Sequence, residues 1–566
     1  MADPTPALAG TASQANSPPR PAATVILLRD GDSGLELLMM RRVEASAFAG
    51  GAYVFPGGRV DPADQSEHWL SHAHGIDPIE ANAQFGITEG ANGYWIAAIR
   101  ECFEESGLLF ATDSSGHLVI DSSRFAHDRA ALIAHRTTLL EIIERHQLSL
   151  SLDRLIYFSH WITQAGRPRR FDARFFIAAV PSEQVASHDG AELDHHVWIN
   201  PVQALEQHRH GDFHMLFPTR RTLEELAAFG TVAEVLAYAR ADRPRLAMTP
   251  ISAMGHAGPV LLAPGDHPYA EVSLLDPDKT GQVSCELRVG ALVPLQAGLA
   301  RITAPSVHPV HDGTVAGVNT YLLGNERSGI IVIDPGPDDA GHLAAIIAQA
   351  PGAIRWILCT HTHRAHAGAA YALASATGAQ LLGKPAPRPG LPDLPLAFDQ
   401  ELSGDETLVL GGLQIGVLAT PGHAANHLCF SYAQGALIFT GDHIAQGPHS
   451  ARTPADAQAM IDLVHSFAQL AQFRAAHIAP GHGFLMAHPN EMYERALTDR
   501  IGRENRVLRA LRESDSGKLE SLLDLAYHDL PAAVRPRWQD TLLAHLRKLQ
   551  GEGRVTQTKS RWRLIA

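Results

Sequence analysis

Cysteine is scarce in this sequence, and no hydrophobic run is long enough to span a bilayer. Only four cysteines occur among 566 residues, and none forms a CxxC pair; they are Cys102, Cys285, Cys359 and Cys429. This scarcity excludes a disulfide-stabilised secreted scaffold and predicts reduced, buried thiols in a cytoplasmic protein. The N-terminus lacks a basic region followed by a hydrophobic run, so no secretory signal is expected.

Excess positive charge is also lacking. The formal net charge is -14, from 46 Lys and Arg against 60 Asp and Glu. Bulk attraction to nucleic acid or to an anionic membrane is therefore not expected. With 45% apolar and 19% charged residues, the composition is that of an ordinary globular protein. The length predicts about three or four domains.

Histidine, by contrast, is abundant, with 32 residues, and several of them follow a common pattern. The apolar run 356–359 predicts a buried strand, and a histidine-rich stretch, 360–368, follows it directly. Other candidates also follow hydrophobic runs and sit beside Gly or Pro, which is typical of ligands on loops at strand ends. Neutral imidazoles are the commonest zinc ligands. The six candidate ligands are His361, His363, His366, His423, Asp442 and His482.

This pattern resembles the metallo-β-lactamase superfamily, whose signature is His-x-His-x-Asp-His, a later His, a bridging Asp and a last His. The resemblance covers about residues 300–490 and implies an αββα sandwich that hydrolyses its substrate with a metal-activated water. The implied ion is Zn²⁺, with Fe or Mn as alternatives. The first ion is implied at His361, His363, His423 and Asp442, and the second at His366, His482 and the shared, catalytic Asp442. Ala365 replaces the signature Asp, so one ion is expected to be held firmly and the second is left open.

A second constellation is acidic. Residues 97–106 lack helix breakers and predict a helix capped by Gly107. Within it, Glu101, Glu104 and Glu105 stand at positions i, i+3 and i+4, so their carboxylates share one face. Hard divalent cations such as Mg²⁺ prefer such oxygen clusters and take substrate phosphates as further ligands.

This helix resembles the second half of the Nudix hydrolase box, Gly-x5-Glu-x7-Arg-Glu-U-x-Glu-Glu-x-Gly-U, where U is aliphatic. The first half is displaced by an insertion from about residue 65 to residue 93. Gly58 leads after five residues to Asp64, an acidic substitute for the first Glu. Gly86 lies at the contiguous spacing, but Asn92 then replaces the Glu, so Gly58 is preferred.

The Nudix resemblance implies an α/β/α sandwich and a bound Mg²⁺ or Mn²⁺. The implied ligands are Glu101, Glu104 and Glu105, the catalytic residues are Glu104, Glu105 and Arg100, and the cofactor-binding loop is Gly57-Gly58. The sequence around this loop is similar to the branch that includes coenzyme A diphosphatases. Gly51 and Arg42 fit the coenzyme A signature of that branch, whereas Ala47 replaces a second Arg. A nucleoside diphosphate linked to another group is therefore implied, and a coenzyme A-like molecule is one option.

The C-terminal region 495–566 is basic, with 15 Lys and Arg against nine Asp and Glu, a net charge of +6. Two amphipathic helices, about 499–513 and 534–550, precede a hairpin from Arg554 to Leu564. This order resembles the small winged-helix domain that follows some metallo-β-lactamase enzymes, including an endoribonuclease-like group. The basic charge would serve either RNA or an acidic neighbouring domain.

The sequence thus predicts a multidomain α/β chain. Its segments are a disordered tail 1–21, a Nudix domain 22–242 closed by helices near 201–207 and 219–240, a connector 243–299, a metallo-β-lactamase-like domain 300–494 and a winged-helix-like domain 495–566. The expected function is a double hydrolase. One half is a pyrophosphohydrolase acting on a nucleotide, and the other acts on a thioester, ester or phosphodiester. The alternatives are an RNA-processing nuclease and a nucleotide sensor with a metal-stabilised, catalytically weakened C-terminal half. The sequence does not indicate the oligomeric state.

Overall fold

The computed structural model describes residues 18–565 except 33, 47–48, 181–183, 190–191, 242–244, 306–316, 388–392, 433, 435, 447–456, 515–516 and 529–534. The chain forms two compact units: Met1–Ser252 with Ala257–Pro264, and Ala253–His256 with Gly265–Ala566. Most of the predicted disordered tail lies outside the described residues. None of the described helices combines the length and apolar character needed to cross a bilayer. The four cysteines are all described and unpaired, and three of them are buried.

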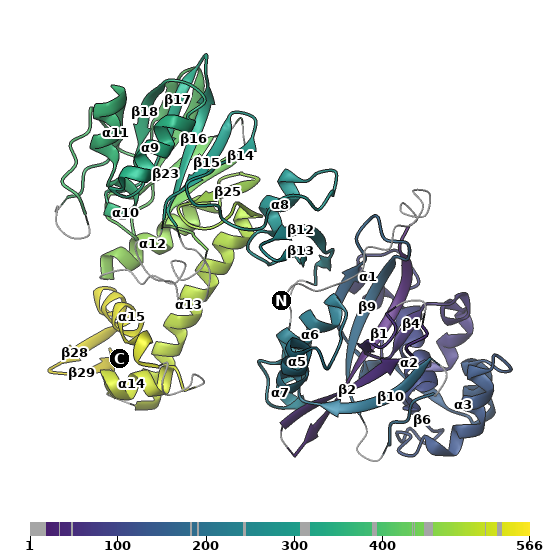
Figure 1. The fold of residues 1–566 in the computed structure, drawn as a ribbon. Helices are drawn as coiled ribbons and strands as arrows, with labels where there is room; N and C mark the ends of the chain where they lie inside the picture. Colours follow the sequence, from purple (N-terminus) through teal and green to yellow (C-terminus); the bar gives the residue numbers. More distant parts are fainter. Residues whose placement is uncertain are drawn as a thin grey trace. The chain divides into compact units, whose positions relative to one another are not determined.

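Unit 1 is built around an eight-stranded mixed sheet in the order β10-β2-β1-β9-β8-β11, with β3 added to β2 and β4 added to β1 (Figure 1). Its strands are β1 (Arg20–Gly31), β2 (Gly34–Arg42), β3 (Tyr53–Val54), β4 (Gly57–Arg59), β8 (Ile156–Ile162), β9 (Phe171–Ala179), β10 (Leu193–Ile199) and β11 (Ala247–Met248). A smaller sheet holds β5 (Ala73–His74), β6 (Ala111–Thr112) and β7 (Ser149–Ser151). β12 (Ile251–Gly255) and β13 (Gly258–Leu262) follow.

Helices cover both faces of the large sheet, which confirms the predicted α/β/α sandwich. On β1, Val25 and Leu27 join the core beneath α2, whereas Ile26 and Leu28 join the core beneath α5, α6 and α7. This alternation is the two-residue period of a strand that is buried on both faces. The helices are α1 (Pro78–Phe85), α2 (Asn92–Ser106), α3 (Ala126–Ile133), α4 (Leu139–Arg145), α5 (Pro201–His210), α6 (Phe217–Leu226) and α7 (Val232–Arg240).

One expected helix of unit 1, 219–240, proves to be two helices. α6 ends at Leu226, and α7 begins after Thr231. The Thr231 hydroxyl accepts from the backbone N–H of Glu234, and the Glu234 side chain accepts from the backbone N–H of Thr231. Because a capping box marks the N-terminus of a helix, the stretch 219–240 forms two helices and not one.

Unit 2 contains two facing sheets, in the orders β14-β15-β16-β17-β18-β19-β20 and β21-β22-β23-β24-β25-β26 (Figure 1). The first sheet comprises β14 (Leu292–Gln296), β15 (Leu299–Thr303), β16 (Asn319–Asn325), β17 (Gly329–Ile333), β18 (Ile354–Leu358), β19 (Gln380–Gly383) and β20 (Gln400–Glu401). The second comprises β21 (Thr407–Leu410), β22 (Leu413–Ala419), β23 (Leu428–Tyr432), β24 (Leu437–Gly441), β25 (His477–Pro480) and β26 (Met486–Ala487).

A shared core joins the two sheets. Leu323 and Ile331 of the first sheet and Phe430 and Phe439 of the second belong to one buried cluster. Separate clusters lie on the outer faces, beneath α9 and α11 on the first sheet and beneath α12 and α13 on the second. The predicted αββα sandwich is therefore confirmed. The helices are α8 (Tyr269–Leu275), α9 (Ala340–Gln349), α10 (Arg364–Ala367), α11 (Ala370–Thr377), α12 (Ala457–Leu470) and α13 (Pro489–Ser514).

The C-terminal region packs its own core from the end of α13, α14 (Leu519–Ala526), α15 (Gln539–Gly551) and the hairpin of β28 (Val555–Thr558) and β29 (Arg561–Leu564). β27 (Gly517–Lys518) completes its three-stranded sheet. The expected hairpin is confirmed, with Lys559 at the turn and a φ of 56°. The helix expected at 499–513 is the second part of the 26-residue α13.

The stretch expected to be a connector, 243–299, contributes secondary structure to both units. β11 pairs in parallel with β8 of unit 1. β14 pairs antiparallel with β15 of unit 2. Pro and Gly in this stretch therefore separate short elements that belong to folded units.

Candidate active sites

The acidic helix of unit 1 is α2, which contains Glu101, Glu104 and Glu105. It faces the glycine-rich strand β4. The Glu105 carboxylate accepts from the backbone N–H of Gly57 at 2.9 Å. A Cβ added at Gly58 would lie 2.4 Å from Glu101 Oε1, so a side chain at this position would displace the Glu101 carboxylate. Gly107 ends the helix with a φ of 73°, as the sequence predicts for its C-terminal cap. Strand β4 and the helix thereby hold the predicted glycines and glutamates together.

Arg100 joins the two separated halves of the acidic motif. Its Nε and Nη2 donate to the two carboxylate oxygens of Asp64 at 3.0 and 2.9 Å, and its Nη1 donates to Glu101 at 2.9 Å. Asp64 is 3% exposed, and its carboxylate also accepts from the backbone N–H of Asp61. A bidentate pair of this kind fixes the plane of the guanidinium. The arrangement brings Asp64, the expected acidic substitute, next to Arg100 and Glu101.

Negative charge is crowded at this site. Burial raises the pKa of Glu101 to about 7, with Arg100 opposing the shift and Glu104 adding to it. Burial, and then the neighbouring Glu101, raise the pKa of Glu105 well above its ordinary value. Burial raises the pKa of Glu104 as well. A divalent cation would relieve this repulsion, so the donor set fits the chemistry of Mg²⁺ or Mn²⁺.

Arg129 of α3, which was not among the predicted residues, holds the end of the acidic helix. Its Nε and Nη2 donate to the carbonyl oxygen of Glu104 at 3.1 and 3.0 Å. Nη2 also donates to the carbonyl oxygens of Glu105 and Ser187, at 3.0 and 2.8 Å. A cation at a helix C-terminus satisfies its free carbonyl groups and complements the helix dipole. No local motif marks Arg129, because its role depends on where α3 packs.

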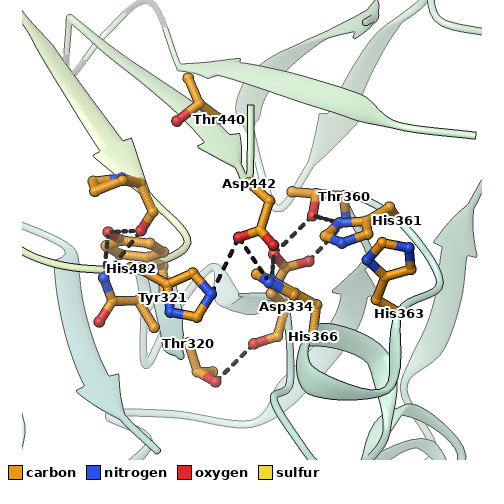
Figure 2. A network of polar contacts seen from close by, with 12 residues as sticks. Thr320, Tyr321, Asp334, Thr360, His361, His363, His366, Thr440, Asp442 and His482 are labelled. Carbon is orange, nitrogen blue, oxygen red and sulfur yellow. Dashed lines mark hydrogen bonds and ion pairs between the residues drawn. The ribbon is translucent and has the colours of Figure 1, made fainter. Parts of the chain in front are cut away.

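In unit 2, the predicted ligands all follow strands, and His366 among them lies on the short helix α10. Figure 2 labels five of the six, without His423. His361, His363 and His366 follow β18, whereas His423 follows β22. The remaining two, Asp442 and His482, follow β24 and β25. β24 and β25 are parallel, so their carboxyl ends meet at one edge of the sheet. The six side chains gather into two groups that share Asp442. Within each group, the ligand atoms all lie within 4.8 Å of one another.

The first group consists of His361, His363, His423 and Asp442. His423 Nε2 lies 3.1 Å from His363 Nδ1 and 3.3 Å from Asp442 Oδ2. His361 Nε2 is buried and has no hydrogen-bond partner. Burial lowers the pKa of His361 well below its ordinary value, and His366 and His363 act in the same direction. A neutral imidazole with a free nitrogen among three further donors fits a zinc-type ion.

The second group consists of His366, Asp442 and His482. Asp442 Oδ1 lies 3.1 Å from His366 Nε2 and 3.2 Å from His482 Nε2. Burial favours a neutral Asp442, but His366 and His482 hold the pKa of its carboxyl group well below its usual range. Asp442 is thus the one residue that belongs to both groups, and the methyl group of Ala365 adds no ligand.

Asp334 directly follows β17 and contacts His366 and Thr360, the residue that precedes the histidine cluster (Figure 2). Its carboxylate accepts from the backbone N–H and the hydroxyl of Thr360, both at 2.8 Å, and lies 2.9 Å from His366 Nδ1. Burial lowers the pKa of His366, but Asp442 and Asp334 outweigh this effect and raise it to about 10. Asp334 has a φ of 51°, which is uncommon for a residue other than glycine. Its position between a buried strand and Pro335-Gly336 was the available sequence signal.

His427 also lies beside the cluster and was not among the predicted residues. Its ring centroid lies 5.1 Å from that of His361, and its Nδ1 lies 2.9 Å from Thr420 Oγ1. A Cβ added at Gly441 would lie 2.8 Å from His427 Nε2, so glycine makes this packing possible. Burial lowers the pKa of His427 well below its ordinary value. His427 belongs to neither ligand group and supports the ring of His361.

We expect unit 2 to hold one ion tightly, because the second group lacks its own carboxylate. Ala365→Asp adds a charged oxygen donor and should raise the Zn²⁺ content of unit 2 from about one ion towards two. The measurement is metal content per chain after dialysis against a mild chelator, with Zn²⁺ as the only added metal. Ala365→Asn is the matched control, because it has the same shape without the charge. Two tightly held ions in unit 2 of the parental protein would contradict this expectation.

Comparison with known families gives a match for the segment that contains each candidate site. Residues 7–225 match the family model of the NUDT19 Nudix domain. Residues 313–482 match the metallo-beta-lactamase superfamily, and residues 519–562 match the beta-lactamase associated winged helix domain. The chain is therefore a hydrolase that combines these three domains in this order.

Individual relatives cover one part of the chain each. It is similar to acyl-coenzyme A diphosphatase NUDT19 of Xenopus laevis, with 26% identity over 45% of this chain and 75% of that protein. It is similar to the beta-lactamase-like protein 2 homolog of Drosophila melanogaster, with 28% identity over 44% of this chain and 87% of that protein. It also resembles the atrochrysone carboxyl ACP thioesterase of Aspergillus chevalieri, with 27% identity over 47% of this chain and 87% of that protein.

Proposed function

We propose that this chain hydrolyses acyl-coenzyme A-type molecules at two separate centres. Unit 1 would cleave the diphosphate link, and unit 2 would cleave the thioester. The observation that carries the proposal is the presence in one chain of the helix glutamates around Arg100 and of the assembled histidine groups around Asp442. An acyl-coenzyme A contains both bonds. The named diphosphatase and thioesterase relatives support one bond each.

In unit 1, the helix glutamates would hold Mg²⁺ or Mn²⁺. When bound, the ion neutralises phosphate charge and lowers the pKa of a water molecule. Asp64 fixes the Arg100 guanidinium, which in turn holds the Glu101 carboxylate at 2.9 Å. Glu105 keeps one oxygen on the Gly57 N–H, and its raised pKa suits a carboxylate that accepts a proton from water. Glu104 and Glu105 are therefore the proposed catalytic glutamates.

In unit 2, the first donor group would hold Zn²⁺, with Fe or Mn as alternatives. When bound, the ion polarises a carbonyl group and activates water. Asp334 fixes the His366 ring, so that its Nε2 faces Asp442. The His482 ring is fixed in the same way, because its Nδ1 lies 3.0 Å from the carbonyl oxygen of Gly317. The ionised Asp442 is thus held by two oriented rings and can bind an ion in either group.

The rival functions receive less support. An RNA-processing role would draw on the basic hairpin, but Arg554 there is paired with Glu504 and Glu552 at 3.2 and 3.4 Å. A nucleotide sensor with a weakened C-terminal half would rest on Ala365 alone. The first donor group of unit 2 does not use that position. Hydrolysis at both centres is the function that uses both donor sets.

The test is product analysis on the full chain with Mg²⁺ and Zn²⁺ and with acyl-coenzyme A as substrate. Diphosphate hydrolysis adds water across the P–O–P link and should release adenosine 3′,5′-bisphosphate and an acyl phosphopantetheine. Thioester hydrolysis should release the free carboxylic acid and a thiol. We expect both product pairs by mass spectrometry. Absence of both pairs, together with cleavage of RNA, would favour the nuclease alternative.

A further inference from the structure

The helix α8 of unit 2 carries a buried carboxylate next to the loop that bears His482. α8 lies in the stretch expected to be a connector and precedes the residues matched by the metallo-beta-lactamase family, 313–482. Its Glu271 is only 3% exposed. A buried charge is costly unless it is paired and hydrogen-bonded, so the surroundings of Glu271 need an explanation.

The partner of Glu271 is Arg301 of β15, which is 1% exposed. Arg301 Nη1 and Nη2 donate to the two carboxylate oxygens of Glu271 at 2.6 and 2.9 Å. Glu271 Oε2 also accepts from the backbone N–H of Leu485 at 2.8 Å. Glu271 therefore connects the first sheet to a residue three positions after His482.

A second connection reaches the same loop from the neighbouring segment. The backbone carbonyl of His267 accepts from Gln446 Nε2 at 3.1 Å. Gln446 Oε1 accepts from the backbone N–H of Phe484 at 2.9 Å, and the Gln446 N–H donates to the carbonyl oxygen of His482 at 3.2 Å. Gln446 itself follows Asp442 by four residues. The segment 267–271 thus contacts the loops of two candidate metal ligands. It reaches the His482 loop through the Leu485 N–H and the Asp442 loop through Gln446.

We propose that Glu271 is a positioning residue of the C-terminal metal centre. Through Arg301 and the Leu485 N–H, it fixes the loop that presents His482 to Asp442. Since Asp442 belongs to both donor groups, the position of this loop affects metal affinity at each of them. The inference rests on the proposed metal-binding role of Asp442 and His482. With this role, α8 of the expected connector 243–299 becomes a structural part of the C-terminal metal centre.

The test compares Glu271→Gln with a matched control in the full chain. Gln keeps an oxygen acceptor but leaves the buried Arg301 charge unpaired. We expect the dissociation constant for Co²⁺ at the unit 2 site to rise about tenfold or more, as for other residues that orient metal ligands. The visible spectrum of bound Co²⁺ should also change. The control is Asp276→Asn, a buried carboxylate that accepts from the N–H groups of Thr280 and Gly281 at 2.8 and 2.7 Å. It should leave both readouts unchanged.

Hydrogen exchange gives a readout without metal. In the metal-free protein, the Leu485 amide should exchange at least about tenfold faster in Glu271→Gln than in Asp276→Asn, because the single neutral oxygen of Gln must serve both Arg301 and the Leu485 N–H. If Glu271→Gln does not fold, Glu271→Met combined with Arg301→Met removes both charges and should fold, but it should retain weak Co²⁺ binding and fast exchange. The proposal would be overturned if either variant kept the parental Co²⁺ affinity and the parental exchange rate of the Leu485 amide. It would also be overturned if Asp276→Asn lost as much Co²⁺ affinity as Glu271→Gln. A parental protein that binds no Co²⁺ in unit 2 would refute the proposed metal centre, and the exchange comparison would still decide the role of Glu271.

Discussion

Glu105→Gln should reduce hydrolysis of the coenzyme A diphosphate by about a hundredfold or more, the range typical of a lost proton-accepting group. The substitution removes one negative charge from a buried cluster and keeps the shape of the side chain. Gln can still accept from the Gly57 N–H, so the β4 contact should survive. Because burial and Glu101 both disfavour the ionised form of Glu105, folding stability should not fall. Glu104→Gln should show the same loss of activity.

The measurement is the rate of adenosine 3′,5′-bisphosphate formation, with the thermal unfolding midpoint recorded for each variant. Glu89→Gln is the matched control, because Glu89 is an exposed glutamate of the same unit. Thioester hydrolysis by unit 2 is an internal control and should be unchanged. If Glu104→Gln and Glu105→Gln both retain the parental rate, the helix glutamates are not the catalytic residues.

Asp442→Asn should abolish tight metal binding in unit 2 and reduce thioester hydrolysis by at least about a hundredfold, the upper end of losses seen for residues that only orient ligands. Asp442 is the one carboxylate common to both donor groups, and Asn supplies no negative charge to balance an ion. Its amide would also place a nitrogen near the rings of His366 and His482. Diphosphate hydrolysis by unit 1 should remain at the parental rate.

Metal content after dialysis and the rate of thiol release test this expectation on the full chain. Asp405→Asn is a suitable control, because Asp405 is an exposed acid of unit 2 that accepts from the Ser403 hydroxyl. Near-parental thioester hydrolysis by a metal-free Asp442→Asn protein would show that the histidine cluster is not the hydrolytic centre. If Asp405→Asn lost thioester hydrolysis to the same extent, the cause would be the change in net charge and not the loss of a metal ligand.

From the sequence by itself, the resemblance to two families implied the two sandwich folds, and the candidate ligands of both sites could be selected. The motifs that carry both depend on local patterns. Apolar runs that end in Gly, Pro or His predict strands with polar loops, and the spacing of Glu101, Glu104 and Glu105 predicts a shared helix face. The basic hairpin near Lys559 was readable for the same reason, because its turn and strands are adjacent in the chain.

Only the tertiary structure decided which distant groups meet. Asp64 reaches Arg100 across an insertion, and Arg129 caps the acidic helix from α3, although neither contact has a fixed spacing in the chain. Glu271 is the clearest case, because it binds the backbone N–H of Leu485. Every residue except proline has such an N–H group, so a backbone partner leaves no mark in the sequence. The candidate ligands can therefore be predicted from side-chain types, whereas the residues that hold them in place depend on how the elements pack.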